Sequence, residues 1–388
     1  MKSRKLLMIP GPIEFTPEVM QVFGAHTDSH VSVDFINSFG HSLELMREVW
    51  MCPSGQPFIV AGSGTLAMDM AGANLIEHGD KALVISTGYF GERYAELLKR
   101  YGADVKVLRA GIGKVVPHEL IEKELAGNDY KLMTFTHVDT STAVRVDPEP
   151  IGLLGKKYDV LTILDGVCSV AGEEIRQEEW GIDVVLTASQ KAIGVPPGLA
   201  LLVASQKAME VWRKRKHPVG NYYADWMNWL PIMQAYEIRK PAYFGTPAVN
   251  LVAALEVSLM QILDEGLETR FRRHEKCGNA FRAAFSGLGM KQIPVRDDIA
   301  ANTLSAPYYP DGIMGLQLIA DMNKAGVIVA GGLHPDNRTE YFRIGHMGAI
   351  APNDILATLG ALEQSLWKGG YEFTCGAGLS AAQSELEF

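Results

Sequence analysis

The residues that could do chemistry stand just after short apolar runs of the sequence. Asp165 directly follows the run 159–164, and Lys191 comes shortly after the run 182–186. The glycine- and hydroxyl-containing segment 61–65 follows another run and precedes a predicted helix, whose first amides could bind a phosphate. Phe90 stands in a similar position and offers an aromatic face. Together these residues provide a nucleophilic amine, a carboxylate, an aromatic platform and a phosphate cradle.

These apolar runs alternate with helical patterns between residues 56 and 205, which predicts a mostly parallel sheet covered by helices on both faces. The segment 198–204 follows 182–186 too closely for a crossover helix, so we expect one reversed strand there. The carboxyl ends of parallel strands meet at one edge of a sheet, where ligands bind. The predicted strands are 57–60, 82–85, 103–108, 131–135, 159–164 and 182–186.

The C-terminal third has a different pattern, and 388 residues exceed a single ordinary core. We expect a large domain over 21–250, a smaller α+β domain over 251–388, and an N-terminal segment, 1–20, packing on the smaller domain. The small polar residues from Thr374 onward suggest a frayed tail. Within this third the predicted helices are 247–265, 313–325 and 352–367, and the predicted strands are 326–330 and 341–345.

This set of an amine, a carboxylate, an aromatic face and a phosphate cradle matches what pyridoxal 5'-phosphate needs from a protein. Its pyridine nitrogen needs a carboxylate such as Asp165, and its aldehyde needs an amine such as Lys191. Its phosphate needs amides and hydroxyls, and its face needs an aromatic such as Phe90. Taken singly, each residue is more often a surface lysine, a helix cap or a core aromatic. The combination, in this order along a βαβ pattern, favours the cofactor.

A nicotinamide oxidoreductase is the alternative from another class. Residues 62–67, Gly-Ser-Gly-Thr-Leu-Ala, fit the G-x-G-x-x-A fingerprint after a strand. That fingerprint also requires an acidic residue at the end of the next strand. The next predicted strand is followed by Ser86 and Thr87 instead, so the nicotinamide interpretation is disfavoured.

The segment Ser189-Gln190-Lys191-Ala192, followed by Pro196-Pro197-Gly198, resembles the cofactor-lysine segment of class V pyridoxal-phosphate-dependent aminotransferases. Within that family the chain looks similar to the alanine–glyoxylate and serine–pyruvate aminotransferases. The resemblance covers nearly the whole chain and implies an α/β protein of fold type I, with a large, mostly parallel sheet domain and a smaller domain. Other matching segments are 10–12, 62–64, 88–91, 137–142, 165–167, 243–246 and 342–345.

The resemblance also implies roles for single residues. Lys191 would hold the cofactor as a Schiff base and move the proton, and Asp165 would pair with the pyridine nitrogen. Arg343 and Gly11 would contact the substrate, with Arg343 gripping its carboxylate. Two cofactor contacts, Tyr243 and Thr246, would come from the partner subunit of a homodimer. The remaining implied cofactor-binding residues are Ser63, Gly64, Thr65, Phe90, Thr140, Val167 and Gln190.

The expected reaction is transamination from alanine, with serine as the second choice of donor, to glyoxylate or pyruvate. A lyase of the kynureninase kind needs the same lysine and stays open. A cysteine desulfurase would need a nucleophilic cysteine and usually a histidine before the lysine, where this chain has Gln190. Before the tail, the C-terminal third contains one cysteine, Cys277. It stands in a charged helical pattern.

The composition bears on partners and location. A net charge of −9 argues against nucleic-acid or anionic-membrane binding, and no apolar run is long enough for a membrane helix. The four cysteines include no CxxC pair, which fits a reducing compartment and indicates neither disulfides nor a metal site. We expect a cytosolic protein, unless a receptor-read signal sends it to an organelle such as a peroxisome or mitochondrion. Four further residues are expected to be structural: His137 and His346 packed inside, Glu173 and Glu174 in solvent.

Overall fold

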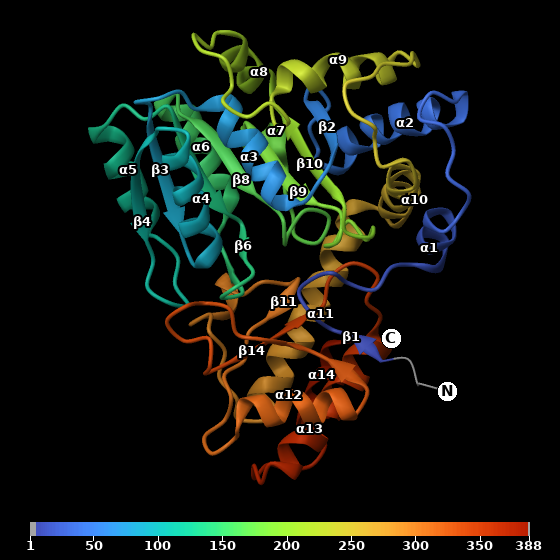
Figure 1. Cartoon of the computed structure of the whole chain (residues 1–388). Helices are drawn as coiled ribbons and strands as arrows, with labels where there is room; N and C mark the ends of the chain where they lie inside the picture. The colour runs from blue at the N-terminus through green and yellow to red at the C-terminus, as the bar shows by residue number, and fades with distance from the viewer. Residues whose placement is uncertain (1–4, 387–388) are drawn as a thin grey trace.

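Residues 5–386 are described by a computed structural model, in which a seven-stranded sheet forms the centre of the larger part (Figure 1). The strand order is β2-β10-β9-β8-β5-β3-β4. Only β10 runs antiparallel to its neighbours, which confirms both the mostly parallel sheet and the reversed strand. The strands are β2 (Gln56–Ala61), β3 (Lys81–Ser86), β4 (Asp104–Arg109), β5 (Leu132–Thr136), β8 (Leu161–Asp165), β9 (Val184–Ala188) and β10 (Leu199–Ala204).

Helices pack on this sheet in two groups. In one group α3 contacts α4 and α8, and in the other α6 contacts α5 and α7. Two of these helices begin with a side-chain cap: Asp147 accepts the Glu149 amide at the start of α6, and Ser205 accepts the Ala208 amide at the start of α8. The helices are α2 (Val33–Val49), α3 (Gly64–Leu75), α4 (Tyr89–Arg100), α5 (His118–Gly127), α6 (Pro148–Tyr158), α7 (Gln177–Trp180), α8 (Gln206–Arg213) and α9 (Trp226–Glu237).

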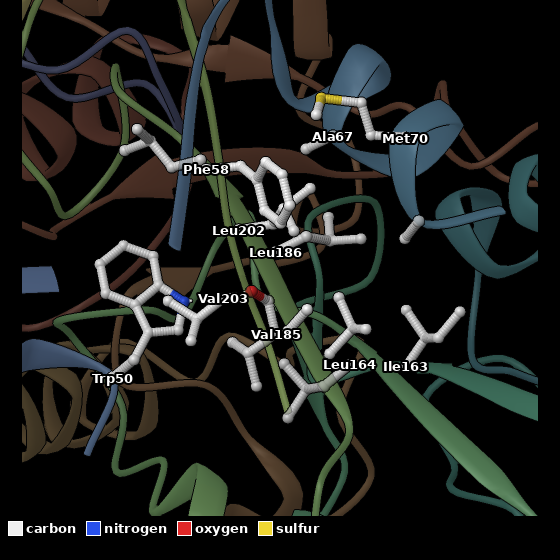
Figure 2. Packing of buried hydrophobic residues seen from close by; sticks show 14 of the residues in the cluster. Trp50, Phe58, Ala67, Met70, Ile163, Leu164, Val185, Leu186, Leu202 and Val203 are labelled. Carbon is white, nitrogen blue, oxygen red and sulfur yellow. Dashed lines mark hydrogen bonds between the residues drawn. The ribbon is translucent and has the colours of Figure 1, made fainter. Parts of the chain in front are cut away.

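The core of the larger part lies between the sheet and these helices, as Figure 2 shows around Phe58, Leu186 and Leu202. The central strands are buried along their whole length, which explains their continuous apolar runs. At the β2 end of the sheet the Phe58 ring stacks on the Trp226 ring, with centroids 5.2 Å apart. The Trp50 indole donates to the Val185 carbonyl at 3.1 Å.

A second core belongs to the smaller part, in the lower half of Figure 1. The smaller part contains a three-stranded sheet of order β11-β14-β13 and the strand pair β1-β12. The elements are α11 (Leu267–Gly287), β11 (Leu304–Ser305), α12 (Gly315–Lys324), β12 (Val327–Ile328), β13 (Ala330–Gly331), β14 (Phe342–Gly345), α13 (Pro352–Lys368) and α14 (Ala377–Glu385).

Two expectations about the chain's division need correction. Helix α10 (Val249–Glu265) packs against α2, and its buried residues belong to the larger core, so 251–265 lie with the larger part. Up to residue 386 the tail is not frayed, because α14 packs along α11, and residues 387–388 lie outside the described residues. Small residues allow this close approach: a Cβ added at Gly378 would lie 2.9 Å from a Leu288 methyl.

The N-terminal segment joins both parts. Strand β1 (Leu6–Leu7) pairs in parallel with β12, and Met8 belongs to the smaller core. Helix α1 (Pro17–Phe23) packs instead on α10 in the larger part. Residues 1–4 of the expected segment lie outside the described residues. Over residues 5–386, no helix is long and apolar enough to cross a membrane.

Candidate active site

Several of the sequence-predicted residues lie at the carboxyl edge of the large sheet. Asp165 is the last residue of β8, and Lys191 follows the end of the neighbouring strand β9. Ser63 follows β2 and occupies the N-cap position of α3. The parallel arrangement of β8 and β9 therefore brings the carboxylate and the amine to the same edge.

Lys191 lies against the N-terminal segment. Its Nζ donates to the Pro10 carbonyl, and the chain is held there by the Ile13 amide, which donates to the Gln190 carbonyl at 3.3 Å. Burial lowers the pKa of the Lys191 amine, and the nearby Arg343 charge lowers it further, while Asp165 opposes this shift. A lowered pKa increases the neutral, nucleophilic fraction of the amine.

Asp165 is a buried carboxylate, 2% exposed. Its Oδ1 accepts the Val167 amide at 3.0 Å. Burial raises the Asp165 pKa to about 6, and the Asp139 charge adds to the rise, whereas Lys191 and Arg93 oppose it. A cation placed against this carboxylate would lower its pKa and favour the ionised form.

Asp139 organises the loop beside Phe90 and is a residue that the sequence analysis did not single out. Its carboxylate accepts the Ser141 amide at 2.9 Å and the Phe90 amide at 3.0 Å. The Ser141 hydroxyl in turn accepts the Tyr89 amide at 3.0 Å. An Asp side chain that accepts the amide two residues later forms an Asx turn, and the turn-forming residue types of 139–141 were the only signal in the sequence.

The N-terminus of α3 has the character of an anion site. Ser63 is exposed and its side chain makes no cap hydrogen bond, and the first turn contains no acidic residue. Gly64 is needed for close packing, since a Cβ there would lie 2.8 Å from a Val167 methyl. Thr65 accepts a hydrogen bond from Arg93 Nη2 at 2.7 Å. Arg93, which the sequence analysis missed, adds a cation behind this helix start.

Two other predicted residues have open hydrogen-bonding capacity. The Gln190 side-chain oxygen is buried and has no partner within residues 5–386. Arg343, in β14, donates from Nε to the Gly331 carbonyl at 2.9 Å and from Nη1 to the Thr140 carbonyl at 3.2 Å. A guanidinium has five N–H donors, so donors remain for a carboxylate. The smaller part thus brings a cation to the edge of the large sheet.

Tyr243 and Thr246 lie on the surface of the chain, in the segment before α10. Tyr243 is 65% exposed, and its hydroxyl is 3.5 Å from the Thr246 hydroxyl oxygen. The Tyr243 ring also lies 5.6 Å from the His30 ring. The structure brings these residues together with each other, on a face open to a neighbouring molecule.

The structure confirms some of the expectations about structural residues and contradicts others. His346 is buried, stacks on Phe281 and contacts the Ser305 hydroxyl at 2.9 Å, which confirms a packing role. His137 was expected to be a satisfied core histidine; it is buried, which lowers its pKa to about 3, but its Nδ1 has no hydrogen-bond partner within residues 5–386. The expectation for Glu173 is wrong: it is 2% exposed and binds the Asn302 side-chain amide at 3.0 Å. Its position on a polar loop hid a long-range partner.

The comparisons with known proteins identify the family. A family model described as aminotransferase class V matches residues 20–332. The chain belongs to the class V aminotransferases. It is 40% identical over 366 residues to alanine–glyoxylate aminotransferase 1 of Saccharomyces cerevisiae, covering 91% of this chain and 94% of the relative.

Two further proteins resemble this aminotransferase over nearly its whole length. The L-aspartate–glyoxylate aminotransferase of Paracoccus denitrificans is 29% identical over 388 residues, covering 99% of this chain and 96% of the relative. The solved structure of ureidoglycine–glyoxylate aminotransferase from Bacillus subtilis superposes with a TM-score of 0.93 at 26% identity, covering 100% of this chain and 99% of that one. The fold is therefore that of the fold-type I transferases.

The family implies pyridoxal phosphate, and the side chains of this aminotransferase fit it. The exposed Ser63 at an acid-free helix start suits a phosphate. The buried Asp165 needs a cation partner, which a protonated pyridine nitrogen provides. Lys191 has a lowered pKa, which suits an amine that must react with the cofactor aldehyde. The topology also disfavours a dinucleotide at 62–67, because β2 is an edge strand bound only to the antiparallel β10.

Proposed function

We propose that this aminotransferase moves an amino group from a small amino acid, alanine or serine, to glyoxylate or pyruvate. The observation that carries the proposal is the placement of Arg343 beside the edge that holds Lys191, with guanidinium donors left for one carboxylate. The relatives named above are described as aminotransferases with different amino donors, and all three names include glyoxylate. A shared acceptor supports glyoxylate first and pyruvate second.

Bound pyridoxal phosphate would supply an electron-accepting ring and the carbonyl carbon that takes up the amino group. Lys191 would hold and release the substrate's α-proton at Nζ, since burial lowers the pKa of this amine. Asp165 would keep a positive charge on the pyridine nitrogen, and Val167 and Phe90 would lie against the ring. Arg343 would orient the substrate carboxylate, and Gly11, which packs against the Lys191 side chain, would contact the substrate beside the amine.

The phosphate would be held from several directions. Ser63, Gly64 and Thr65 provide the start of α3, and Gln190 would approach from the Lys191 segment. Thr140 would reach the ring hydroxyl. In the structure its own carbonyl accepts Arg343 Nη1, so the loop that carries Thr140 would link the cofactor to the substrate arginine.

We also propose a homodimer in which Tyr243 and Thr246 bind the phosphate of the partner's cofactor. Both are exposed in the single chain and their hydroxyls lie next to each other, which suits two donors to one anion. Each site would then be completed only across the interface. The cytosolic location expected from the sequence stays a prediction.

A desulfurase activity finds no support in the cysteines. Cys277 is buried in α11, and burial raises its pKa to about 11, so the thiol stays protonated and weakly nucleophilic. Cys375 is exposed and precedes α14, whose first residue Ala377 lies against Gly287 at the C-terminal end of α11.

A donor and acceptor panel on the purified protein tests the proposal. Alanine with glyoxylate should be the best pair or close to it, with serine as the next donor. Borohydride should abolish the yellow colour and leave a pyridoxyl group on Lys191, found by peptide mapping. Lys207→Ala is a matched control, because Lys207 pairs with Asp159 on the surface. A label on another lysine, or a preference for cysteine or kynurenine over alanine and serine, would contradict it.

A further inference from the structure

The hydroxyl of Tyr341 connects three segments at the border of the two parts. Tyr341 is fully buried and immediately precedes β14. Its hydroxyl accepts the amides of Leu333 and His334, each at 2.8 Å, and donates to the Ser141 carbonyl. A tyrosine hydroxyl has one donor and two acceptor positions, so its hydrogen-bonding capacity is fully used.

The same face of β14 carries Arg343, because residues two apart on a strand point the same way. Arg343 Nη1 donates to the Thr140 carbonyl at 3.2 Å, so the two side chains bind adjacent carbonyls of one loop. That loop belongs to the larger part. Its position is fixed from the other side by Asp139, which accepts the Ser141 amide at 2.9 Å.

The hairpin 332–340 connects β13 to β14 and also depends on Tyr341. Gly332 allows the hairpin backbone to lie close to the Tyr341 ring, because a Cβ at this position would lie 2.7 Å from Tyr341 Cε1. The other end of the hairpin is β13, whose Gly331 carbonyl accepts Arg343 Nε at 2.9 Å. Both carbonyls that orient the guanidinium are therefore attached to segments that meet at the Tyr341 hydroxyl.

We propose that Tyr341 is a positioning residue that sets the location of Arg343 relative to the loop at Thr140. This inference rests on the proposed function, in which Arg343 binds the substrate carboxylate. Without the hydroxyl, the Leu333 and His334 amides and the Ser141 carbonyl lose their partner. The guanidinium would keep its charge but lose a fixed orientation, and a bidentate contact needs that orientation.

Two small probes separate carboxylate recognition from reactivity at the cofactor. Hydroxylamine and aminooxyacetate both displace the Lys191 amine from the bound cofactor, and only aminooxyacetate carries a carboxylate. The ratio of their second-order rate constants, followed by absorbance, therefore reports the contribution of Arg343. Arg343→Ala should lower the ratio for aminooxyacetate over hydroxylamine by about a hundredfold, and Tyr341→Phe by about tenfold.

Two comparisons make the result specific. Tyr309→Phe is the matched control, because Tyr309 stacks on Phe342 within the smaller part, and its ratio should stay within about twofold. In an Arg343→Ala background, Tyr341→Phe should have no further effect on the ratio, since Tyr341 acts through Arg343. The dissociation constant for pyridoxal phosphate, measured by titrating the apoprotein, should also change less than about twofold in Tyr341→Phe.

Each possible result of these measurements supports or contradicts a named part of the inference. If Arg343→Ala lowers the ratio and folded Tyr341→Phe does not, the role of Tyr341 is purely structural and the inference is wrong. If Arg343→Ala itself leaves the ratio unchanged, the proposed carboxylate site fails. Should Tyr341→Phe not fold, Gly332→Ala displaces the same hairpin from the Tyr341 ring and should also lower the ratio. An unchanged ratio there overturns the inference as well.

Discussion

Gly11 packs directly against the side chain of Lys191. A Cβ added at Gly11 would lie 2.5 Å from Lys191 Cδ and 2.7 Å from Nζ. Both distances are shorter than any normal contact, so a side chain here would displace the lysine. The N-terminal segment is therefore part of the wall that sets the position of the amine.

Gly11→Ala should slow amino-group transfer by about a hundredfold, because a displacement of about 1 Å in a reacting group has that effect. The measurement is kcat with alanine and glyoxylate. Gly326→Ala is the matched control. The two glycines have nearly the same φ, +98° and +97°, but Gly326 has open space where a Cβ would lie. Both variants carry the backbone strain, so equal loss of turnover in both would contradict the contact argument.

Asp165 should make the stability of the apoprotein depend on pH. Its pKa rises from 3.8 to about 6 on folding, so the folded state binds its proton more tightly than the unfolded state does. The resulting stabilisation is complete below pH 3.8 and is lost as the pH rises through about 6. The shift corresponds to about 3 kcal/mol.

Urea unfolding of the apoprotein and of Asp165→Asn between pH 4 and 7 measures this effect. The difference in unfolding free energy between the two should fall with rising pH and level off above about 6. With cofactor bound, Asp165→Asn should also slow turnover, because the uncharged pyridine nitrogen is a poorer electron acceptor. A pH-independent difference would show that Asp165 titrates normally.

Neighbouring glutamates should differ sharply in their effect on stability. The Glu173 side chain is 1% exposed, binds Asn302 and lies 3.7 Å from Arg145, whereas the Glu174 side chain is 44% exposed. Glu173→Ala should lower the free energy of unfolding by about 2 to 4 kcal/mol, since it leaves buried donors unpaired. Glu174→Ala, the control, should cost less than about 1 kcal/mol. Similar losses in both would contradict the assigned burial.

Mixing two inactive variants should test the shared site. One variant is Arg343→Ala, and the other combines Tyr243→Phe with Thr246→Ala. If Tyr243 and Thr246 serve the partner's cofactor, a mixed dimer contains one site with both defects and one with neither. About half of the activity of a normal dimer should then return in the mixed species. No recovery, despite demonstrated subunit exchange, would place each site within one chain.

Local patterns were enough to predict much of this protein. The strands ending in Asp165 and leading to Lys191 were predicted because buried parallel strands form continuous apolar runs. Their shared edge followed from the rule that carboxyl ends of parallel strands lie together. The tail was predicted wrongly, because its small polar residues resemble a frayed end when they are seen without α11.

By itself, the sequence determined the βαβ order, the reversed strand and the chemical types at the carboxyl edge, because each depends on residues near one another in the chain. Tertiary structure decided the contacts that join distant segments. Lys191 and Pro10 are 181 positions apart, and Tyr341 and Ser141 are 200 apart. Periodicity carries no information about such pairs, since any buried tyrosine or glutamate has the same local signature. Only the packing of the smaller part on the larger one shows which groups satisfy each other.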